Sequence, residues 1–231
     1  MTTRRRDFLG WLGVSAASAV AGSALTPRTA AAAPAPGRDS LAPLPDNKWD
    51  MSWVDKVTGK HRAVFDSVEV DEGVGLFRAC VWRDQYAEIY GTSKSEMTPV
   101  LVIRHASIPL AMNDEYWKRF NVGKTAKIKD SATNKWTTVN PIRVAGPRAT
   151  GKWADYNLTS FMAQGGIVLA CDLALRRVIA DFVKADKLKP AEARAKAIAH
   201  VIPGIVMMPS GVFAVLRAQE AGCGYILASE A

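Results

Sequence analysis

Cysteine is scarce in this chain of 231 residues, which has three, at positions 80, 171 and 223. A small secreted protein held together by disulfides would need more of them. Charged residues make up 23% of the chain and hydrophobic residues 48%. This balance excludes a disordered chain, a collagen-like repeat and a coiled coil, and it is typical of a globular protein with a sizeable apolar core.

Several motifs with well-understood chemistry are missing from the sequence. There is no G-x-x-x-x-G-K-[ST], no G-x-G-x-x-G, no G-x-S-x-G and no C-x-x-C. Nucleotide binding through a phosphate loop and thioredoxin-type dithiol chemistry therefore lack support. The three histidines, at positions 61, 105 and 200, show no metal-ligand spacing. We expect no cofactor and no metal.

The first 33 residues have the layout of an export signal. Arg5 and Arg6 are followed by a weakly apolar stretch over residues 9–25 and by small residues at 29–33 that suit cleavage. The arginine pair resembles a twin-arginine signal, with an ordinary secretory signal or an uncleaved anchor as the alternatives. The middle stretch is too weakly apolar for a convincing membrane span. We expect a periplasmic or otherwise exported protein with no stable membrane span after cleavage.

The net charge of +8 does not point to a nucleic-acid partner. Removal of residues 1–33 deletes four Arg and one Asp and leaves a net charge of +5. The remaining basic residues are spread over many segments and interleaved with acidic ones, whereas nucleic-acid binding favours a clustered basic stripe. We therefore predict a basic surface without a nucleic-acid function.

The mature chain is predicted to form one α/β domain. Residues 34–48 are rich in proline and indicate an extended leader, and the globular pattern covers residues 49–231. Apolar runs predict five strands, at 62–66, 99–103, 167–170, 204–208 and 224–228. Helical patterns lie between them, near 74–91, 113–120, 155–164, 172–182, 190–200 and 212–221. This alternation predicts a three-layer sandwich around a mainly parallel five-stranded sheet.

One long segment interrupts the alternation of strands and helices. Residues 121–152 are rich in Lys, Thr, Asn, Gly and Pro, and we predict a surface insertion there with a small hairpin around Ser131–Asn134. Trp117, Trp136 and Trp153 flank the segment or lie within it. Aromatic side chains at this density mark an interface, or they attach the loop to the rest of the domain.

Chemistry is expected where the strands of the parallel sheet end, because ligands bind outside their carboxyl ends. The residues at these ends are Asp66, Arg104, His105, Cys171, Asp172, Ser210 and Gly211. Cys171 is the most informative, because it stands between a strand and a helix. Backbone N–H groups at a helix N-terminus stabilise a thiolate and lower a cysteine pKa. The alternative is that Cys171 is a small buried core residue.

The roles predicted for the other candidate residues depend on where they lie relative to the carboxyl-end edge of the sheet. His105 lies on it and is predicted to act as a proton donor or acceptor or to orient Cys171. Cys80 lies beside the apolar face of a helix and Cys223 at the opposite edge of the sheet, so both are predicted to be structural. Asp66 is either a cap or turn residue or, together with His105, part of a hydrolase or transferase site.

Two segments of the chain resemble the DsrE-like family of sulfur-relay proteins. One is Gly166–Arg177, an apolar strand followed by Cys171 and a helix, and the other is Val206–Gln219 with the closing strand at Gly224–Leu227. The resemblance covers the order of elements from about residue 61 to 229. The segments 121–152 and 185–203 have no counterpart in a compact family member.

The resemblance implies a protein that carries sulfur as a persulfide on Cys171, needs no cofactor, passes the sulfur to a partner thiol protein and forms trimers or hexamers. The known relay is cytoplasmic, whereas this chain is predicted to be exported. A persulfide is less secure in a compartment that contains oxidants. The competing hypothesis is a non-enzymatic oligomeric binding or assembly module in which Cys171 is structural. In that case the strand-end edge or the segment 121–152 binds the ligand or partner.

Overall fold

The structure of the protein is a computed structural model that describes residues 47–144 and 155–229. The predicted signal peptide, nearly all of the predicted leader, residues 145–152 of the predicted insertion and residues 153 and 154 after it lie outside the described residues. Trp153 is among them.

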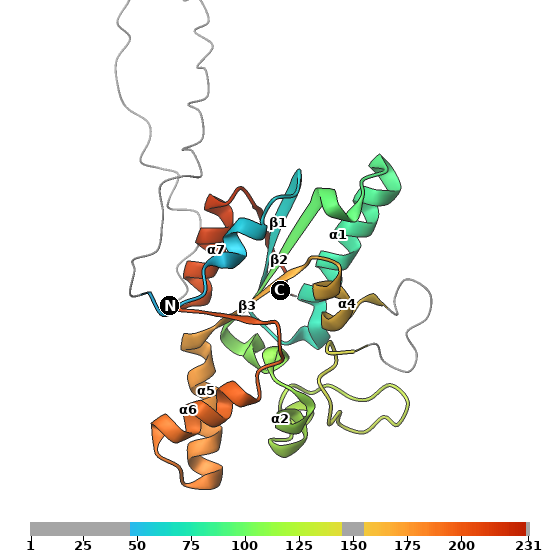
Figure 1. The fold of residues 1–231 in the computed structure, drawn as a ribbon. Coiled ribbons are helices and arrows are strands. Elements are labelled where there is room, and N and C mark those ends of the chain that lie inside the picture. Colours follow the sequence, from blue (N-terminus) through green and yellow to red (C-terminus); the bar gives the residue numbers. More distant parts are fainter. Residues whose placement is uncertain (1–46, 145–154, 230–231) are drawn as a thin grey trace, which may run out of the picture. The chain divides into compact units, whose positions relative to one another are not determined.

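Five parallel strands form a single sheet in the order β4-β3-β2-β1-β5. The strands are β1 (His61–Ser67), β2 (Met97–Ile103), β3 (Ile167–Cys171), β4 (Val206–Met208) and β5 (Gly224–Leu227). Helices flank the sheet on both faces (Figure 1). The predicted α/β sandwich with a five-stranded parallel sheet is confirmed, and each strand is at the predicted place within two residues.

The helices are α1 (Val74–Tyr90), α2 (Asp114–Arg119), α3 (Val122–Thr125), α4 (Leu158–Ala163), α5 (Asp172–Asp186), α6 (Pro190–Ala199) and α7 (Gly211–Glu220). Short 3-10 helices complete the described chain: η2 (Ser52–Lys56), η3 (Asp71–Gly73), η4 (Lys94–Glu96) and η5 (His105–Ala111). Two helix ends have the capping residue that the sequence predicts. Gly91 ends α1 in the left-handed conformation, and Asn113 accepts a hydrogen bond from the N–H of Tyr116 at the start of α2.

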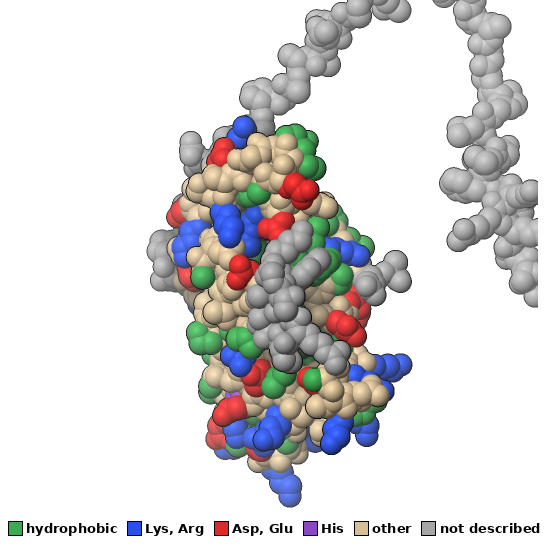
Figure 2. Space-filling view, turned by 90° about the vertical axis from the view of Figure 1, so that its right-hand side faces the viewer, with side chains coloured by type: hydrophobic (Ala, Val, Ile, Leu, Met, Phe, Trp, Pro, Cys, Tyr) green, Lys and Arg blue, Asp and Glu red, His purple; other side chains and the backbone are tan. Residues whose placement is uncertain are grey.

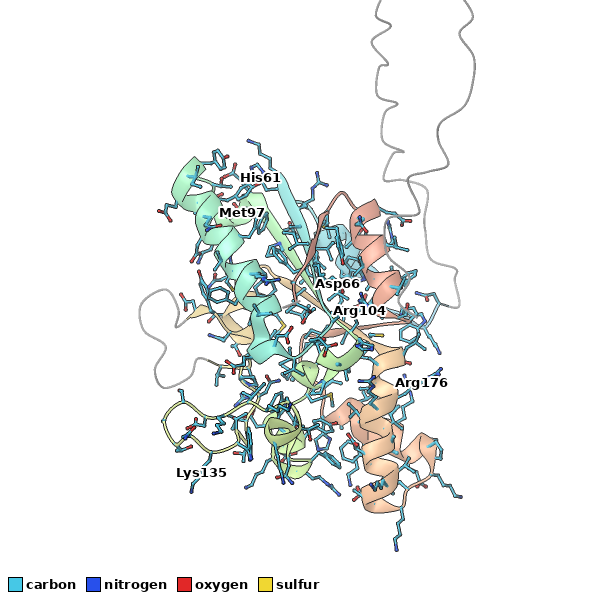
Figure 3. All side chains as sticks on the ribbon, turned by 180° about the vertical axis from the view of Figure 1, so that it is seen from behind. His61, Asp66, Met97, Arg104, Lys135 and Arg176 are labelled. Carbon is cyan, nitrogen blue, oxygen red and sulfur yellow. The ribbon has the colours of Figure 1, made fainter. Side chains whose placement is uncertain are left out.

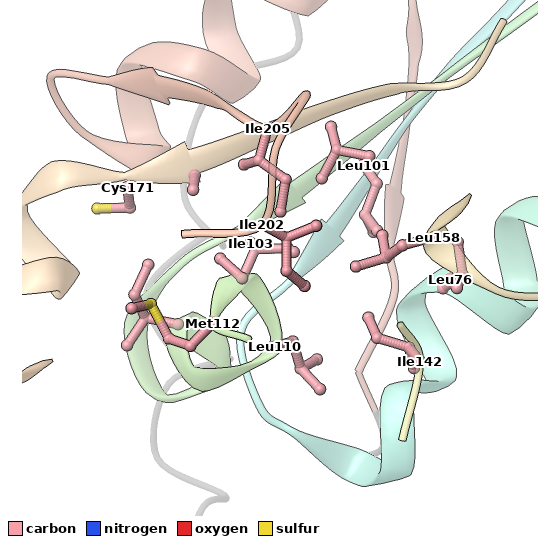
Figure 4. Packing of buried hydrophobic residues seen from close by; sticks show 14 of the residues in the cluster. Leu76, Leu101, Ile103, Leu110, Met112, Ile142, Leu158, Cys171, Ile202 and Ile205 are labelled. Carbon is pink, nitrogen blue, oxygen red and sulfur yellow. The ribbon is translucent and has the colours of Figure 1, made fainter. Parts of the chain in front are cut away.

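Successive side chains of a strand point to opposite faces, which divides the core in two. On one face, Phe65 of β1 packs in a large cluster with residues of α1, α5 and α6. On the other face, Val64 packs in a smaller cluster with α7 and η2. Figure 1 shows α7 and α1 on opposite sides of the strands, and Figure 4 shows part of the larger cluster. The strands read as continuous apolar runs because both faces of the sheet are covered.

The register aligns the carboxyl ends of the two central strands. His61 pairs with Met97 at one end of β1 and β2, and Ser67 pairs with Ile103 at the other. Figure 3 shows His61 and Met97 near one end of the sheet, with Asp66 and Arg104 together toward the other end. The residues predicted to share one edge therefore follow strands that end at the same level.

The segment after α2 is more deeply integrated than a surface insertion. Val122, Ile128 and Ile142 are buried in the larger core cluster. An antiparallel bridge between Lys129 and Trp136 closes the turn in which the hairpin was predicted. The sequence did not predict that this segment contributes to the core, because its composition is mainly polar. The apolar residues that reach the core are few and widely spaced between turns.

None of the helices in the described part of the chain combines the length and the apolar character that a bilayer crossing needs. Within residues 47–144 and 155–229, no group of three or more His, Cys, Asp or Glu side chains is arranged to hold a metal ion. The face shown in Figure 2 carries acidic and basic side chains intermixed.

Candidate functional site

The strand order changes direction once across the sheet. The chain moves from β1 to β4 in one direction across the sheet and then returns to β5 beside β1. As a result β3 leads into α5 on one face, while its neighbour β4 leads into α7 on the other. The strand order itself reverses between β1 and β5, and this is the switch point near which open parallel sheets bind ligands.

Cys171 lies at the carboxyl end of β3, two strands from β1. It is the last residue of β3, paired with Met208 of β4, and it caps α5. Its Sγ accepts a hydrogen bond from the N–H of Ala174 at 3.3 Å. The side chain lies at the border of the larger core cluster, with 5% of the residue exposed. Figure 4 shows its sulfur directed away from Ile202 and Ile205. The predicted position between strand and helix N-terminus is therefore present.

Arg104 supplies a positive charge to the same edge. Its Nε and Nη2 donate to the two carboxylate oxygens of Asp66 at 2.7 and 2.8 Å. Its stem passes over the start of α7, where a Cβ on Gly211 would come within 2.4 Å of the Cβ and Cδ of Arg104. The pKa of Arg104 is raised mainly by the hydrogen bonds with Asp66, with further attraction from Asp66, Tyr225 and Cys171. Cys171 is thus within electrostatic range of this guanidinium.

Tyr225 completes the polar network from the edge strand β5. Its hydroxyl donates to Oδ2 of Asp66 at 3.0 Å. Burial raises the pKa of Tyr225, and the hydrogen bond with Asp66 raises it further. Tyr225 as a whole is 47% exposed, whereas Asp66 is only 2% exposed. Asp66 is therefore a buried carboxylate that holds both Arg104 and Tyr225 in place, rather than a solvent-facing acid.

His105 follows Arg104 but does not join Cys171. It opens η5 with a positive φ of 55°, and its Nδ1 lies 3.5 Å from Oε1 of Glu69. Its side chain is 56% exposed. Within the described residues no hydrogen bond or ion pair links His105 to Cys171. Of Arg104 and His105, it is Arg104 whose charge interacts with Cys171.

The other two cysteines have the surroundings of structural residues. Cys80 is fully buried on α1, and burial raises its pKa to about 11. Cys223 is buried directly before β5, and burial raises its pKa to about 12. Both thiols are free, as is that of Cys171. The two would be protonated at neutral pH and thus poor nucleophiles.

The remaining residues that the sequence singled out have local roles. His61 packs edge-on against Tyr86 at a centroid distance of 4.9 Å, at the start of β1. His200 follows α6, with its Nδ1 2.8 Å from the carbonyl oxygen of Lys196. Trp117 is fully buried and donates to the carbonyl oxygen of Pro109 at 2.7 Å, so it anchors its segment to the domain. Trp136 is 42% exposed.

A cavity of about 540 Å³ lies beside η5, on the side of the sheet that α1 and α5 cover. Its lining comes from the connection after β1, from η5, from the α2–α3 region and from the middle of α5. No motif in the sequence announced it, because its walls are contributed by four segments spread between residues 69 and 181. Cys171 is not part of its lining.

Together, the fold and the site define an α/β protein with a parallel sheet and a thiol that caps a helix at the carboxyl end of one strand. Comparisons with protein-family models, with curated proteins and with solved structures give no match. The resemblance to the DsrE-like family therefore stays a prediction from the two quoted segments.

Proposed function

We propose that this protein carries sulfane sulfur as a persulfide on Cys171. The observation that carries the proposal is the position of its Sγ, which accepts the N–H of Ala174 at the start of α5. Arg104 adds a positive charge from the neighbouring strand end. A helix N-terminus and a nearby guanidinium both favour the thiolate, which is the nucleophilic form of cysteine.

The transfer needs no change in overall oxidation state. To load the protein, the Cys171 thiolate attacks the outer sulfur of a persulfide or polysulfide donor, R–S–SH. The donor S–S bond breaks, R–S⁻ leaves with the electron pair, and Cys171–S–SH remains. To unload it, a partner thiolate attacks the outer sulfur and Cys171 leaves as a thiolate. The Ala174 N–H and Arg104 stabilise the anion each time it forms.

Limited exposure of Cys171 is compatible with this role. The residue is 5% exposed, so a small anionic donor reaches its thiol more readily than a bulky one. Once loaded, the outer sulfur extends about 2 Å beyond Sγ, the length of one S–S bond. A partner thiol then reacts with an atom nearer the surface than Sγ itself.

The test is incubation of the folded, reduced protein with inorganic polysulfide, followed by alkylation and mass-spectrometric assignment of each cysteine. We expect an adduct of about 32 Da, one sulfur atom, on Cys171. The Cys171→Ser variant should lose it, while Cys80→Ala and Cys223→Ala should retain it. Labelling of all three cysteines at equal rates, or no adduct on Cys171, would refute the proposal.

The second candidate function is an oligomeric binding or assembly module. The observation that favours it is a set of exposed apolar side chains on α7 and on the edge strand β5: Val212, Phe213, Leu216, Tyr225 and Leu227. Contiguous exposed apolar surface marks protein contacts. If this surface joins copies of the chain, Leu216→Asp should shift the mass measured by light scattering to that of a smaller species. A Cys171→Ser variant should then keep the wild-type mass.

We further propose that the protein is exported through its predicted twin-arginine signal. Replacing Arg5 and Arg6 with lysine should retain a larger precursor inside the cell, since the arginine pair is the recognised feature. Unchanged export of that variant would favour an ordinary secretory signal.

A further inference from the structure

The cavity beside η5 has the size and lining of a small-molecule site. Its volume of about 540 Å³ falls within the usual range for ligand pockets. It opens among the loops that follow β1 and β2, on the side of the sheet where parallel α/β folds bind ligands. Its apolar wall includes Ile108, Phe120, Val122 and Val178.

Two side chains of opposite charge line the cavity without forming an ion pair with each other. Arg177 and Asp181 both line the cavity and are four residues apart on α5, so they occupy adjacent turns of one helix face. No ion pair joins them, and Arg177 forms no hydrogen bond or ion pair with any residue that the structure describes. The guanidinium of Arg177 and the carboxylate of Asp181 are therefore both available to contact a bound ligand.

Asp181 is held in place for such an interaction. The hydroxyl of the buried Tyr116 donates to its Oδ2 at 2.5 Å. Burial of Tyr116 raises the pKa of its phenol, and the bond to Asp181 raises it further, so the hydroxyl stays a donor. Tyr116 thereby fixes the carboxylate while leaving Oδ1 without a hydrogen-bond partner among the described residues.

We propose that this cavity binds a free α-amino acid with an apolar side chain, its ammonium group at Asp181 and its carboxylate at Arg177. The apolar wall takes the side chain, and the ring of Phe120 favours an aromatic or branched one. Bidentate pairing of a carboxylate with arginine is among the strongest polar contacts available to the ligand.

The charges around the opening favour a zwitterion over an ion of one sign. Glu69, Asp71 and Lys127 also line the cavity, and His105 lies 3.5 Å from Glu69. A simple anion would meet the three carboxylates of Glu69, Asp71 and Asp181, and a simple cation would meet Arg177 and Lys127. A zwitterion places each of its charges near a group of opposite sign. This inference is independent of the sulfur-carrier proposal, because Cys171 does not line the cavity.

The test is calorimetric titration of the folded protein with L-phenylalanine and L-leucine. Two analogues of phenylalanine each keep one charge: 2-phenylethylamine has only the ammonium group and 3-phenylpropionate only the carboxylate. We expect binding of at least one amino acid with a Kd of about 1 mM or tighter. Each analogue should bind at least about tenfold more weakly, since it lacks one charged contact.

The matched variants are Arg177→Gln and Arg176→Gln, two neighbouring exposed arginines of α5 of which only Arg177 lines the cavity. Arg177→Gln should weaken amino-acid binding about tenfold or more, and Arg176→Gln should leave it within about twofold of wild type. No binding of either amino acid up to about 10 mM would overturn the proposal. So would an analogue that binds as tightly as phenylalanine, or an Arg177→Gln variant that binds normally.

Discussion

Asp66, at the end of β1, and Arg104, directly after β2, share two hydrogen bonds of 2.7 and 2.8 Å across adjacent strands. The carboxylate is 2% exposed, and the arginine side chain 28%. The pair therefore neutralises a buried charge and fixes a guanidinium at the edge where Cys171 caps α5.

The first prediction concerns the stability that this pair contributes. Asp66→Asn keeps the size of the side chain but removes its charge, and it leaves a partly buried guanidinium without its counterion. We expect the free energy of unfolding in urea to fall by about 1–3 kcal/mol at pH 7. Partial exposure of Arg104 keeps the loss below that for a fully buried pair.

A double-mutant cycle with Arg104→Gln separates the pair from the surroundings of each residue. If the two side chains act together, the double variant should lose less stability than the sum of the single losses. Strict additivity would show that the contact contributes nothing of its own.

The sequence predicted the edge itself but not the details within it. Apolar runs located every strand, and a parallel sheet brings the residues that follow Phe65, Ile103 and Ala170 to one side. The sequence did not show which of the consecutive residues Arg104 and His105 faces the thiol. In the structure Arg104 is bound to Asp66 and its charge interacts with Cys171, whereas His105 lies beside Glu69.

Two other features depend on contacts between distant segments. Tyr225 reaches Asp66 from a strand 159 residues further along the chain, and its partner depends on the return of β5 to the side of β1. The cavity is likewise formed by segments far apart in the sequence. The local periodicity of apolar residues indicates where strands and helices form. It carries no information about which distant segments come into contact.

The second prediction concerns Gly73, which precedes α1 with a φ of +90°. A Cβ there would lie 1.9 Å from Cγ2 of Ile142, a buried residue of the segment predicted to be a surface insertion. Gly73→Ala combines backbone strain with a clash, and we expect it to lower the free energy of unfolding by about 2–4 kcal/mol.

Gly165 provides the matched control for Gly73. Its φ is +84°, yet a Cβ would meet nothing within 4 Å. Gly165→Ala should therefore cost only the backbone strain, about 1 kcal/mol. Equal losses in the two variants would mean that Ile142 does not pack against Gly73 in solution.

The third prediction is a loss of stability in alkali that arises from the structural thiols. Burial raises the pKa of Cys80 to about 11 and that of Cys223 to about 12, from an ordinary value of 9.0. The unfolded chain then releases these protons at lower pH than the folded one. The stabilisation is complete below pH 9 and is lost as the pH rises through 11 and 12.

The measurement is urea unfolding under reducing conditions at pH 7 and at pH 10. The two thiols together should account for a loss of about 2–3 kcal/mol over this interval. A Cys80→Ala/Cys223→Ala variant should lose correspondingly less between the two pH values, although it starts from a lower stability. An identical decline in the variant would assign the alkaline loss to other groups.

The fourth prediction concerns the effect of Arg104 on the reactivity of Cys171. Because the guanidinium attracts negative charge on this sulfur, Arg104→Gln should slow the reaction of Cys171 with iodoacetamide at pH 7 by about three- to tenfold. Lys135→Gln removes the same charge from an exposed loop that Figure 3 shows well away from Arg104, and should leave the rate unchanged. Salt should reduce the difference between Arg104→Gln and wild type, since screening weakens the attraction. If Arg104→Gln and Lys135→Gln react at the wild-type rate, the thiol is activated by α5 alone.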